Sequence, residues 1–316
     1  IENFRVNKIL AFRGLKQQAI DTAEAGDIVS LAGMSKATVA DTIADQSVED
    51  PIPAQPIDPP TITVTFGIND SPLAGRDGKK VQSRVIRDRL LKECESNVAI
   101  KMVDTPGGEA FDVSGRGELQ MGVLIENMRR EGFELSISRP RVIYKDVDGV
   151  KNEPIEEVTI DVDEEFSGAV IEKLSSRKGE MVDLKSSGSG KTRIIALVPS
   201  RGLIGYHSEF MTDTRGTGIL NRVFHSWSPH KGSIAGRRQG VLISMENGSS
   251  VAYAIFNLEE RGKFFIGSGE EVYEGMIIGE HNRDNDLEVN PLKGKKLTNI
   301  RASGNDEAVR LTPPTK

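Results

Sequence analysis

The feature that most constrains this sequence is a unit that occurs twice. In each copy a strand-like run ends at an Arg-Gly pair, a helix-like stretch ends at a glycine, and a second strand-like run follows. The first copy runs from Val113 to Val142, and the second from Val198 to Trp227. The two Arg-Gly pairs lie about 85 residues apart, which is roughly the length of one small domain. The sequence therefore predicts a duplicated domain.

The residues around the first copy predict the order β-α-β-β-α-β. Residues 61–68 alternate as a strand, and residues 99–103 and 111–113 form two more strands around a Pro-Gly-Gly turn. A last strand begins at Phe133. Two helices carry apolar stripes, which are Val81, Val85, Ile86, Leu90 and Cys94 in the first and Leu119, Val123, Leu124 and Met128 in the second.

The second copy predicts the same order. Residues 156–162 form a strand, and Val170, Ile171 and Leu174 mark a helix. Residues 181–185 and 193–198 form a hairpin, and a tight turn at Arg201-Gly202 leads into a helix from Leu203 and a strand from Ile219. This order is the split βαβ unit of ferredoxin-like domains.

The rest of the chain is predicted to be β-rich. Residues 1–50 are assigned to the C-terminal part of a β-barrel, and the proline-dense residues 51–60 to a semi-rigid linker. The two ferredoxin-like domains then take residues 61–148 and 149–232. In residues 233–316, strands are predicted at 240–245, 251–258, 263–266 and 272–278, with a type I′ turn at Asn247-Gly248. The fold class is α+β.

Three of the predicted helices end in basic residues followed by a glycine, at Gly132, Gly179 and Gly216. Glycine accepts the left-handed conformation that closes a helix, and cations favour the negative end of the helix dipole. The basic residues at these ends are therefore explained by capping before any binding role is considered.

Composition excludes several functional classes. The net charge is −6, there is one cysteine, and no apolar run approaches the length of a membrane span. We expect a monomer in the cytoplasm that does not contact membranes. The chain starts without a methionine, inside a strand-like run, so a fragment of a longer protein is expected.

No catalytic or metal site is predicted. Residues 187–192 resemble a phosphate-binding loop, but Lys185 stands where its first glycine belongs and a strand follows instead of a helix. A hairpin turn is predicted there. The four histidines lack metal-ligand spacing, and His207 is expected to be packed in its domain. Cys94 is expected in the core.

The best functional candidate is the basic loop at residues 290–303, which has four cations and no acid. Such a segment can follow a phosphate backbone, and the alternative is a solvated loop. A second, weaker basic patch lies before it. The predicted RNA-binding residues are Lys293, Lys295, Lys296, Asn299, Arg301 and Ser303 in the loop and His230, Lys231, Arg237 and Arg238 in the patch.

Three stretches resemble the BipA (TypA) family of translational GTPases, which is similar to elongation factor G and LepA. They are VSGRGELQMGVLIENMRREGFE, LVPSRGLIGYHSEFMTDTRGTGILNRVFHSWSPHKG and NPLKGKKLTNIRASG. The resemblance covers nearly the whole chain. It implies the end of domain II, domains III and V, and the C-terminal domain that is specific to the family.

The resemblance also implies a function. The family binds the ribosome and acts in subunit assembly and stress adaptation, so ribosomal RNA of the large subunit is the expected partner. The C-terminal loop would reach the A site and the acceptor end of tRNA there. The chain departs from the family in having no GTPase domain, since Asn7-Lys8-Ile9-Leu10 lacks the aspartate of a guanine-reading motif. GTP and Mg would bind only in the parent protein.

Two alternatives stay open at this point. An autonomous RNA-binding assembly module would not require the ribosome. An enzyme on the ferredoxin-like repeats is the third possibility, because that fold hosts many activities.

Overall fold

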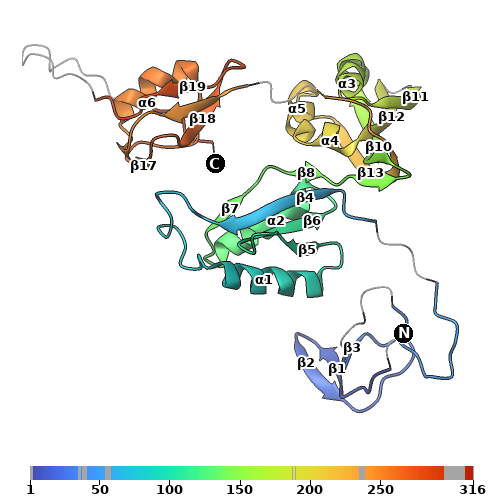
Figure 1. The fold of residues 1–316 in the computed structure, drawn as a ribbon. Helices are drawn as coiled ribbons and strands as arrows, with labels where there is room; N and C mark the ends of the chain where they lie inside the picture. The colour runs from blue at the N-terminus through green and yellow to red at the C-terminus, as the bar shows by residue number, and fades with distance from the viewer. Residues whose placement is uncertain are drawn as a thin grey trace, which may run out of the picture.

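The computed structural model describes residues 3–34, 37, 41–53, 58–186, 188, 190–234, 239–294 and 310–315. Figure 1 shows a small N-terminal sheet, two α+β repeats and a C-terminal α+β part along the chain. The N-terminal sheet has the order β2-β1-β3, and both pairings are antiparallel. Its strands are β1 (Lys8–Arg13), β2 (Lys16–Ile20) and β3 (Val29–Ala32). This agrees with the β-rich prediction for residues 1–50.

The first repeat has the predicted β-α-β-β-α-β order. Its elements are β4 (Ile62–Ile68), α1 (Ser83–Ser96), β5 (Lys101–Asp104), β6 (Ala110–Gly115), α2 (Glu118–Arg130) and β7 (Leu135–Ile137). The sheet order is β5-β6-β4-β7, and the short strand β8 (Arg141–Val142) also pairs with β4. The first and third strands of the unit are therefore central, as the ferredoxin-like prediction requires.

The buried face of α2 differs from the predicted stripe. Met121, Leu124 and Met128 are buried against the sheet. Leu119 is 81% exposed and Val123 is 52% exposed. At about 100° per residue, these two side chains lie roughly 140° and 100° around the helix from Leu124. The helix can therefore bury only one of the two stripes, and it buries the one that contains the methionines.

The second repeat has the same topology, with the sheet order β11-β12-β10-β13. Its elements are β10 (Val150–Asp163), α3 (Glu164–Ser176), β11 (Glu180–Ser186), β12 (Lys191–Pro199), α4 (Ser200–Leu203), α5 (Tyr206–Asp213) and β13 (Ile219–Pro229). A further strand, β9 (Lys145–Val147), pairs with β10. Strands β11 and β12 pair on both sides of residues 187–190, so the segment that resembles a phosphate-binding loop joins a hairpin.

The prediction of one helix from Leu203 is wrong. The chain forms two short helices, and the predicted turn residues Arg201 and Gly202 lie inside α4. Gly205 has a φ of 71°, which is a left-handed conformation that breaks the helical path between α4 and α5. His207, which was expected to be packed, is exposed on α5.

The helix ends follow the capping prediction fully at only one of three places. Gly132 has a φ of 85°, whereas at the end of α5 both Arg215 and Gly216 are left-handed, with φ values of 50° and 79°. At the end of α3 it is Lys178 that takes the left-handed conformation, with a φ of 65°. Gly179 is needed for space instead, because a Cβ there would lie 2.8 Å from the Leu174 carbonyl oxygen.

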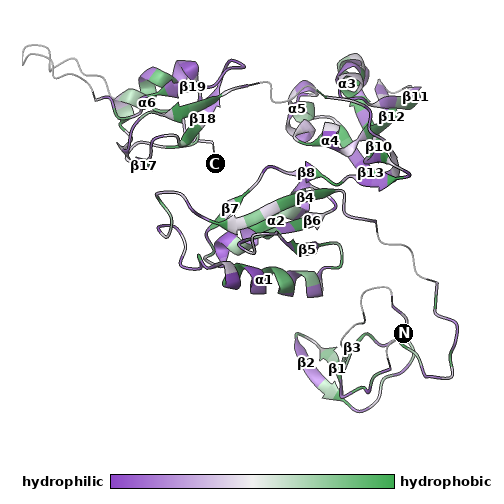
Figure 2. Cartoon of the chain, in the orientation of Figure 1, coloured by the Kyte–Doolittle hydropathy of each residue, from purple (hydrophilic) through white to green (hydrophobic). Residues whose placement is uncertain are grey.

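The C-terminal part has one sheet in the order β16-β18-β14-β19 and a second in the order β15-β17. Its strands are β14 (Val241–Ser244), β15 (Gly248–Ser249), β16 (Gly262–Phe264), β17 (Glu271–Val272), β18 (Ile277–His281) and β19 (Leu287–Val289). Its helices are α6 (Ala252–Leu258) and the 3-10 turn η1 (Glu259–Arg261). In Figure 2, β4 and β18 are mainly hydrophobic, whereas α1 mixes both colours.

Two predictions for this part are wrong. Residues 251–258 were predicted to be a strand, but α6 occupies them and buries Ala254 and Ile255. Gly248 lies in β15 and pairs with Val272, so Asn247-Gly248 is not the turn of a hairpin. A short apolar run is compatible with a buried strand or a buried helix, and here packing against the core favours the helix. A further strand, β19, lies at Leu287–Val289, where no strand was predicted.

Candidate nucleic-acid interface

The structure describes three of the ten predicted RNA-binding residues, which are His230, Lys231 and Lys293. The other seven lie outside the described residues: Arg237, Arg238, Lys295, Lys296, Asn299, Arg301 and Ser303. Lys293 is exposed just after β19. The three described residues do not form one cluster, since Lys293 belongs to the C-terminal part and the other two follow β13.

The start of the basic loop is tied to the C-terminal core. The side-chain amide of Asn290 donates to a carboxylate oxygen of Glu246 over 2.9 Å. Its own side-chain oxygen accepts from the amide of Leu292, also at 2.9 Å. Leu292 packs against the apolar cluster around Leu242. The polar atoms of Asn290 therefore fix residues 290–292, where the loop begins.

His230 belongs to a cluster that we name the Tyr144 patch, formed by Tyr144, Lys151 and His230. The ammonium of Lys151 lies 3.7 Å from the centroid of the Tyr144 ring. The rings of Tyr144 and His230 lie 5.9 Å apart, and all three residues are exposed. Aromatic faces next to cations suit stacked bases beside phosphates, so this patch has the chemistry of a nucleic-acid contact.

A second cluster, the Trp227 patch, consists of Lys145, Phe224 and Trp227. The Lys145 ammonium lies 4.1 Å from the Trp227 ring centroid, and the rings of Phe224 and Trp227 lie 5.8 Å apart. Strand pairing brings the patch together, because Pro154 of β10 opposes Trp227 while Asn152 opposes Lys145. Sequence reasoning had named His230 of the Tyr144 patch but missed the other members of that patch and the whole Trp227 patch, although Tyr144-Lys145 and the aromatic content around Trp227 were visible signals.

Lys231 has structural partners. Its ammonium lies 2.9 Å from a carboxylate oxygen of Glu180, and its amide donates to Glu153 over 2.7 Å. Glu153 is fully buried and is paired with Arg201 of α4. Burial opposes the charged form of Glu153, but its bonds from Arg201 and Lys231 outweigh that effect and lower its pKa. Arg201 also donates to the Gly232 carbonyl over 2.5 Å. This cluster fixes the segment that carries His230.

The Tyr144 patch lies at the rim of a cleft of about 600 Å³ between the two repeats. The cleft is lined by Thr63, Asp112, Pro140, Arg141, Val142, Ile143, Tyr144, Arg201 and Ile204. Arg141 donates to Asp112 over 3.1 Å and to the Thr65 hydroxyl over 3.0 Å. The open face of the first sheet is therefore polar where it borders the cleft.

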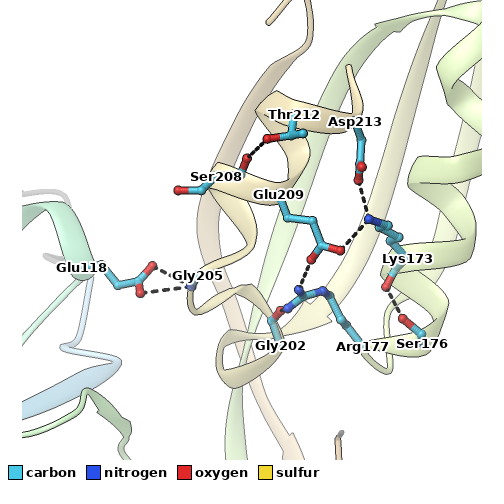
Figure 3. A network of polar contacts seen from close by, with 10 residues as sticks. All are labelled: Glu118, Lys173, Ser176, Arg177, Gly202, Gly205, Ser208, Glu209, Thr212 and Asp213. Atoms are coloured by element: carbon cyan, nitrogen blue, oxygen red, sulfur yellow. Dashed lines mark hydrogen bonds and ion pairs between the residues drawn. The ribbon is translucent and has the colours of Figure 1, made fainter. Parts of the chain in front are cut away.

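An ion-pair network holds α5 against α3 (Figure 3). The Lys173 ammonium lies 2.5 Å from Glu209 and 2.7 Å from Asp213, and Arg177 donates to Glu209 over 2.5 Å. The Arg177 guanidinium also stacks on the ring of Tyr206, with 4.8 Å between them. Burial raises the pKa of Tyr206 to about 12. Both carboxylates have cation partners, so the network is suited to holding the helices and has no free general base.

The same network adjoins a contact between the repeats. The amide of Gly205, in the break between α4 and α5, donates to the carboxylate of Glu118 over 3.1 Å and 3.4 Å. Ile204, next to it, packs against the core of the first repeat. Glu118 is the first residue of α2, so the helical break of one repeat contacts the helix start of the other.

The described part of the chain contains neither a group of side chains placed to hold a metal ion nor a helix that could span a membrane. None of its His, Cys, Asp and Glu side chains form a group of three placed to hold a metal ion. None of its helices has the length and hydropathy needed to cross a membrane.

Comparison with known proteins matches this architecture to translation factors. Residues 150–238 match the family described as elongation factor G C-terminus. Residues 239–316 match the TypA/BipA C-terminal domain. Together these two matches cover residues 150–316.

Full-length relatives agree with these matches. The large ribosomal subunit assembly factor BipA of Bacillus subtilis strain 168 is 51% identical over 98% of the chain, which covers 51% of that protein. The proteins of the same name from Escherichia coli K12 and Haemophilus influenzae are each 51% identical over 99% of the chain. The chain spans about half the length of the curated relatives it matches.

Proposed function

We propose that this chain is the ribosome- and rRNA-binding part of a translational GTPase that acts in assembly of the large ribosomal subunit and in stress adaptation. The relatives carry the name of a large-subunit assembly factor, which supports the assembly role. The observation that carries the binding role is the Tyr144 patch, where a cation, a phenol ring and an imidazole meet on an exposed surface.

The proposal extends to the arrangement of the parent protein. Residues 61–148 and 149–232 would be its domains III and V, and residues 233–316 its family-specific domain. GTP and Mg would bind in a GTPase domain of the parent, and this chain would need no cofactor. The basic loop with Lys293, Lys295, Lys296 and Arg301 would reach the A site of the large subunit and the acceptor end of tRNA. We propose a monomer that works in the cytoplasm.

An RNA-binding assembly module that does not require the ribosome is the second candidate. It is favoured by the position of the Tyr144 patch, which is complete within residues 144–230 and needs no residue of the basic loop. Preference for free rRNA over assembled subunits would support this candidate over the first.

The test is cosedimentation of the chain with purified large subunits across a salt series. Phosphate contacts release counterions, so each one that is lost reduces the slope of log affinity against log salt by roughly 0.7 to 0.9. The loop variant changes Lys293, Lys295, Lys296 and Arg301 to Ala, and the patch variant changes Tyr144, Lys151 and His230 to Ala. The control variant changes the exposed Lys92 and Lys101 to Ala.

We expect the parent chain and the control variant to sediment with subunits at low salt, and both test variants to bind at least tenfold more weakly. Loss in the loop variant alone would assign the anchor to the loop and remove the Tyr144 patch from the interface. If the parent chain does not sediment at any salt concentration, the ribosome-binding proposal fails. The same series with free rRNA fragments separates the two candidate functions.

A further inference from the structure

The C-terminal part contains a polar pocket of about 340 Å³ whose lining includes no residue of the Tyr144 patch or of the basic loop. It is lined by Glu260, Arg261, His281, Asn282 and Arg283. Its volume lies at the lower end of the range typical of ligand sites, and its lining is almost entirely charged or polar. Such a lining favours a small, highly charged ligand over an apolar one.

Strand pairing and backbone hydrogen bonds fix the frame of this pocket. Gly262 opposes His281 across β16 and β18, and the Asn282 amide donates to the Arg261 carbonyl over 2.9 Å. The Arg283 carbonyl accepts from the Gly240 amide over 2.6 Å. A Cβ at Gly240 would collide with the Asn285 carbonyl, and this shows how closely these segments approach. The backbones of both arginines are therefore held in place.

His281 and Asn282 hold the pocket in shape from within. The Nδ1 atom of His281 lies 2.6 Å from the Asn285 carbonyl oxygen, which only accepts, so Nδ1 carries the proton. This bond closes the turn that presents Arg283. The side-chain amide of Asn282 donates to the Glu260 carbonyl over 3.0 Å and joins the turn to η1.

The two guanidinium groups are available to a ligand. Arg261 and Arg283 are exposed, and among the described residues neither side chain has a hydrogen bond or an ion pair. This contrasts with Arg89, Arg177 and Arg201, which are all paired with glutamates. Two guanidinium forks at one pocket can bind the oxygens of a phosphate group in bidentate fashion.

Acidic neighbours limit which anions can bind. The Glu259 carboxylate accepts a hydrogen bond from the Thr312 amide at 2.7 Å. The Asp286 carboxylate accepts one from the Val241 amide at 2.9 Å. Glu260 and Asp284 are exposed beside the arginines. These carboxylates weaken the long-range attraction of anions in general. Binding must therefore depend on close contacts with the guanidinium groups, which favours a compact anion with several oxygens.

We propose that this pocket is a phosphate-binding site, with Arg261 and Arg283 as the ligand-contacting residues and His281 and Asn282 as positioning residues. The phosphate group can come from a free phosphate ester or from an RNA backbone, and both present the same oxygens. This site is independent of the RNA interface proposed above, because it shares no residue with it.

The test follows backbone amide NMR shifts of the whole chain during titration with inorganic phosphate, and separately with a short single-stranded RNA, at constant ionic strength. The variant R261Q/R283Q removes both cations. The control variant R84Q/R139Q makes the same charge change at two exposed arginines outside the pocket. Dispersed spectra of both variants verify that they are folded.

We expect saturable shifts of the Asn282, Arg283 and Gly240 amides in the parent chain and the control variant, and at least tenfold weaker binding in R261Q/R283Q. Shifts with inorganic phosphate show that a free phosphate group is a sufficient ligand, whereas shifts with RNA alone identify the RNA backbone as the source. The site is overturned if neither probe shifts these amides, or if R261Q/R283Q binds as well as the parent chain. Ribosome cosedimentation can fail while this titration succeeds, so the two proposals are tested separately.

Discussion

At the scale of single residues, Glu134 shows how one buried carboxylate orders a whole loop. It is 8% exposed, and it accepts hydrogen bonds from the side chain of Asn69 and from the amides of Gly75, Asp77 and Gly78, with lengths of 2.6–3.1 Å. The segment between β4 and α1 has few apolar side chains to pack. Four donors of this segment therefore converge on one carboxylate.

The carboxylate of Glu134 should make the stability of the chain depend on pH. The Gly75 amide and the other donors hold its pKa below the ordinary value of 4.5. A carboxyl group whose pKa is lower in the folded state than in the unfolded state stabilises the fold at pH values above the unfolded-state pKa. This stabilisation is lost as the pH falls through the folded-state pKa. Glu134→Gln should therefore lower the free energy of unfolding by about 1–3 kcal/mol at pH 7, because the buried donors lose a charged acceptor.

The measurement is urea unfolding of Glu134→Gln and the parent chain at pH 7 and at pH 3. The difference between them should shrink at the lower pH. Glu172→Gln serves as the control, because Glu172 is exposed on α3. A difference that is equally large at both values would show that the charge of Glu134 does not matter.

At the scale of secondary-structure elements, sequence patterns predict the order of both repeats because each helix and strand there has a clear apolar period. Sequence patterns do not predict the secondary structure of a segment when packing decides between a helix and a strand. Residues 251–258 form a helix because Ala254 and Ile255 enter the C-terminal core, which no local pattern reveals. The Tyr144 patch is equally hidden, since β9, β10 and β13 must pair before its members meet.

The end of α3 allows an element-scale prediction. The left-handed conformation of Lys178 is sterically unfavourable for a residue with a side chain. At Gly179 the Leu174 carbonyl leaves no room for a Cβ atom. Lys178→Gly should raise the free energy of unfolding by up to about 1 kcal/mol, since relief of strain exceeds the added chain entropy. Gly179→Ala should lower it by more than about 1 kcal/mol. Chemical denaturation checks both changes, and the m-value should be the same in the variants and the parent chain. Lys178→Ala is the control and should gain nothing.

At the scale of the whole molecule, the two repeats meet where the helical break of the second contacts the start of α2 in the first. The break between α4 and α5 exposes the Gly205 amide. This amide donates a hydrogen bond to the carboxylate of Glu118 at the start of α2. Arg222 of β13 approaches the same carboxylate at 4.0 Å. The network around Lys173 and Glu209 holds α5 on α3, so the break is presented in a fixed position.

Glu118→Ala should therefore loosen the contact between the repeats without unfolding either one. The Gly205 amide loses its acceptor, so its hydrogen exchange should accelerate at least tenfold, while amides in the cores of both sheets keep their protection. Spin labels at Lys92→Cys and Glu172→Cys, in a Cys94→Ala background, should give a broader distance distribution. Glu126→Ala, a change on the same helix away from Gly205, is the matched control. An unchanged distance distribution together with unchanged exchange at Gly205 would mean that Ile204 packing alone sets the arrangement of the repeats, and that the carboxylate only occupies the space beside it.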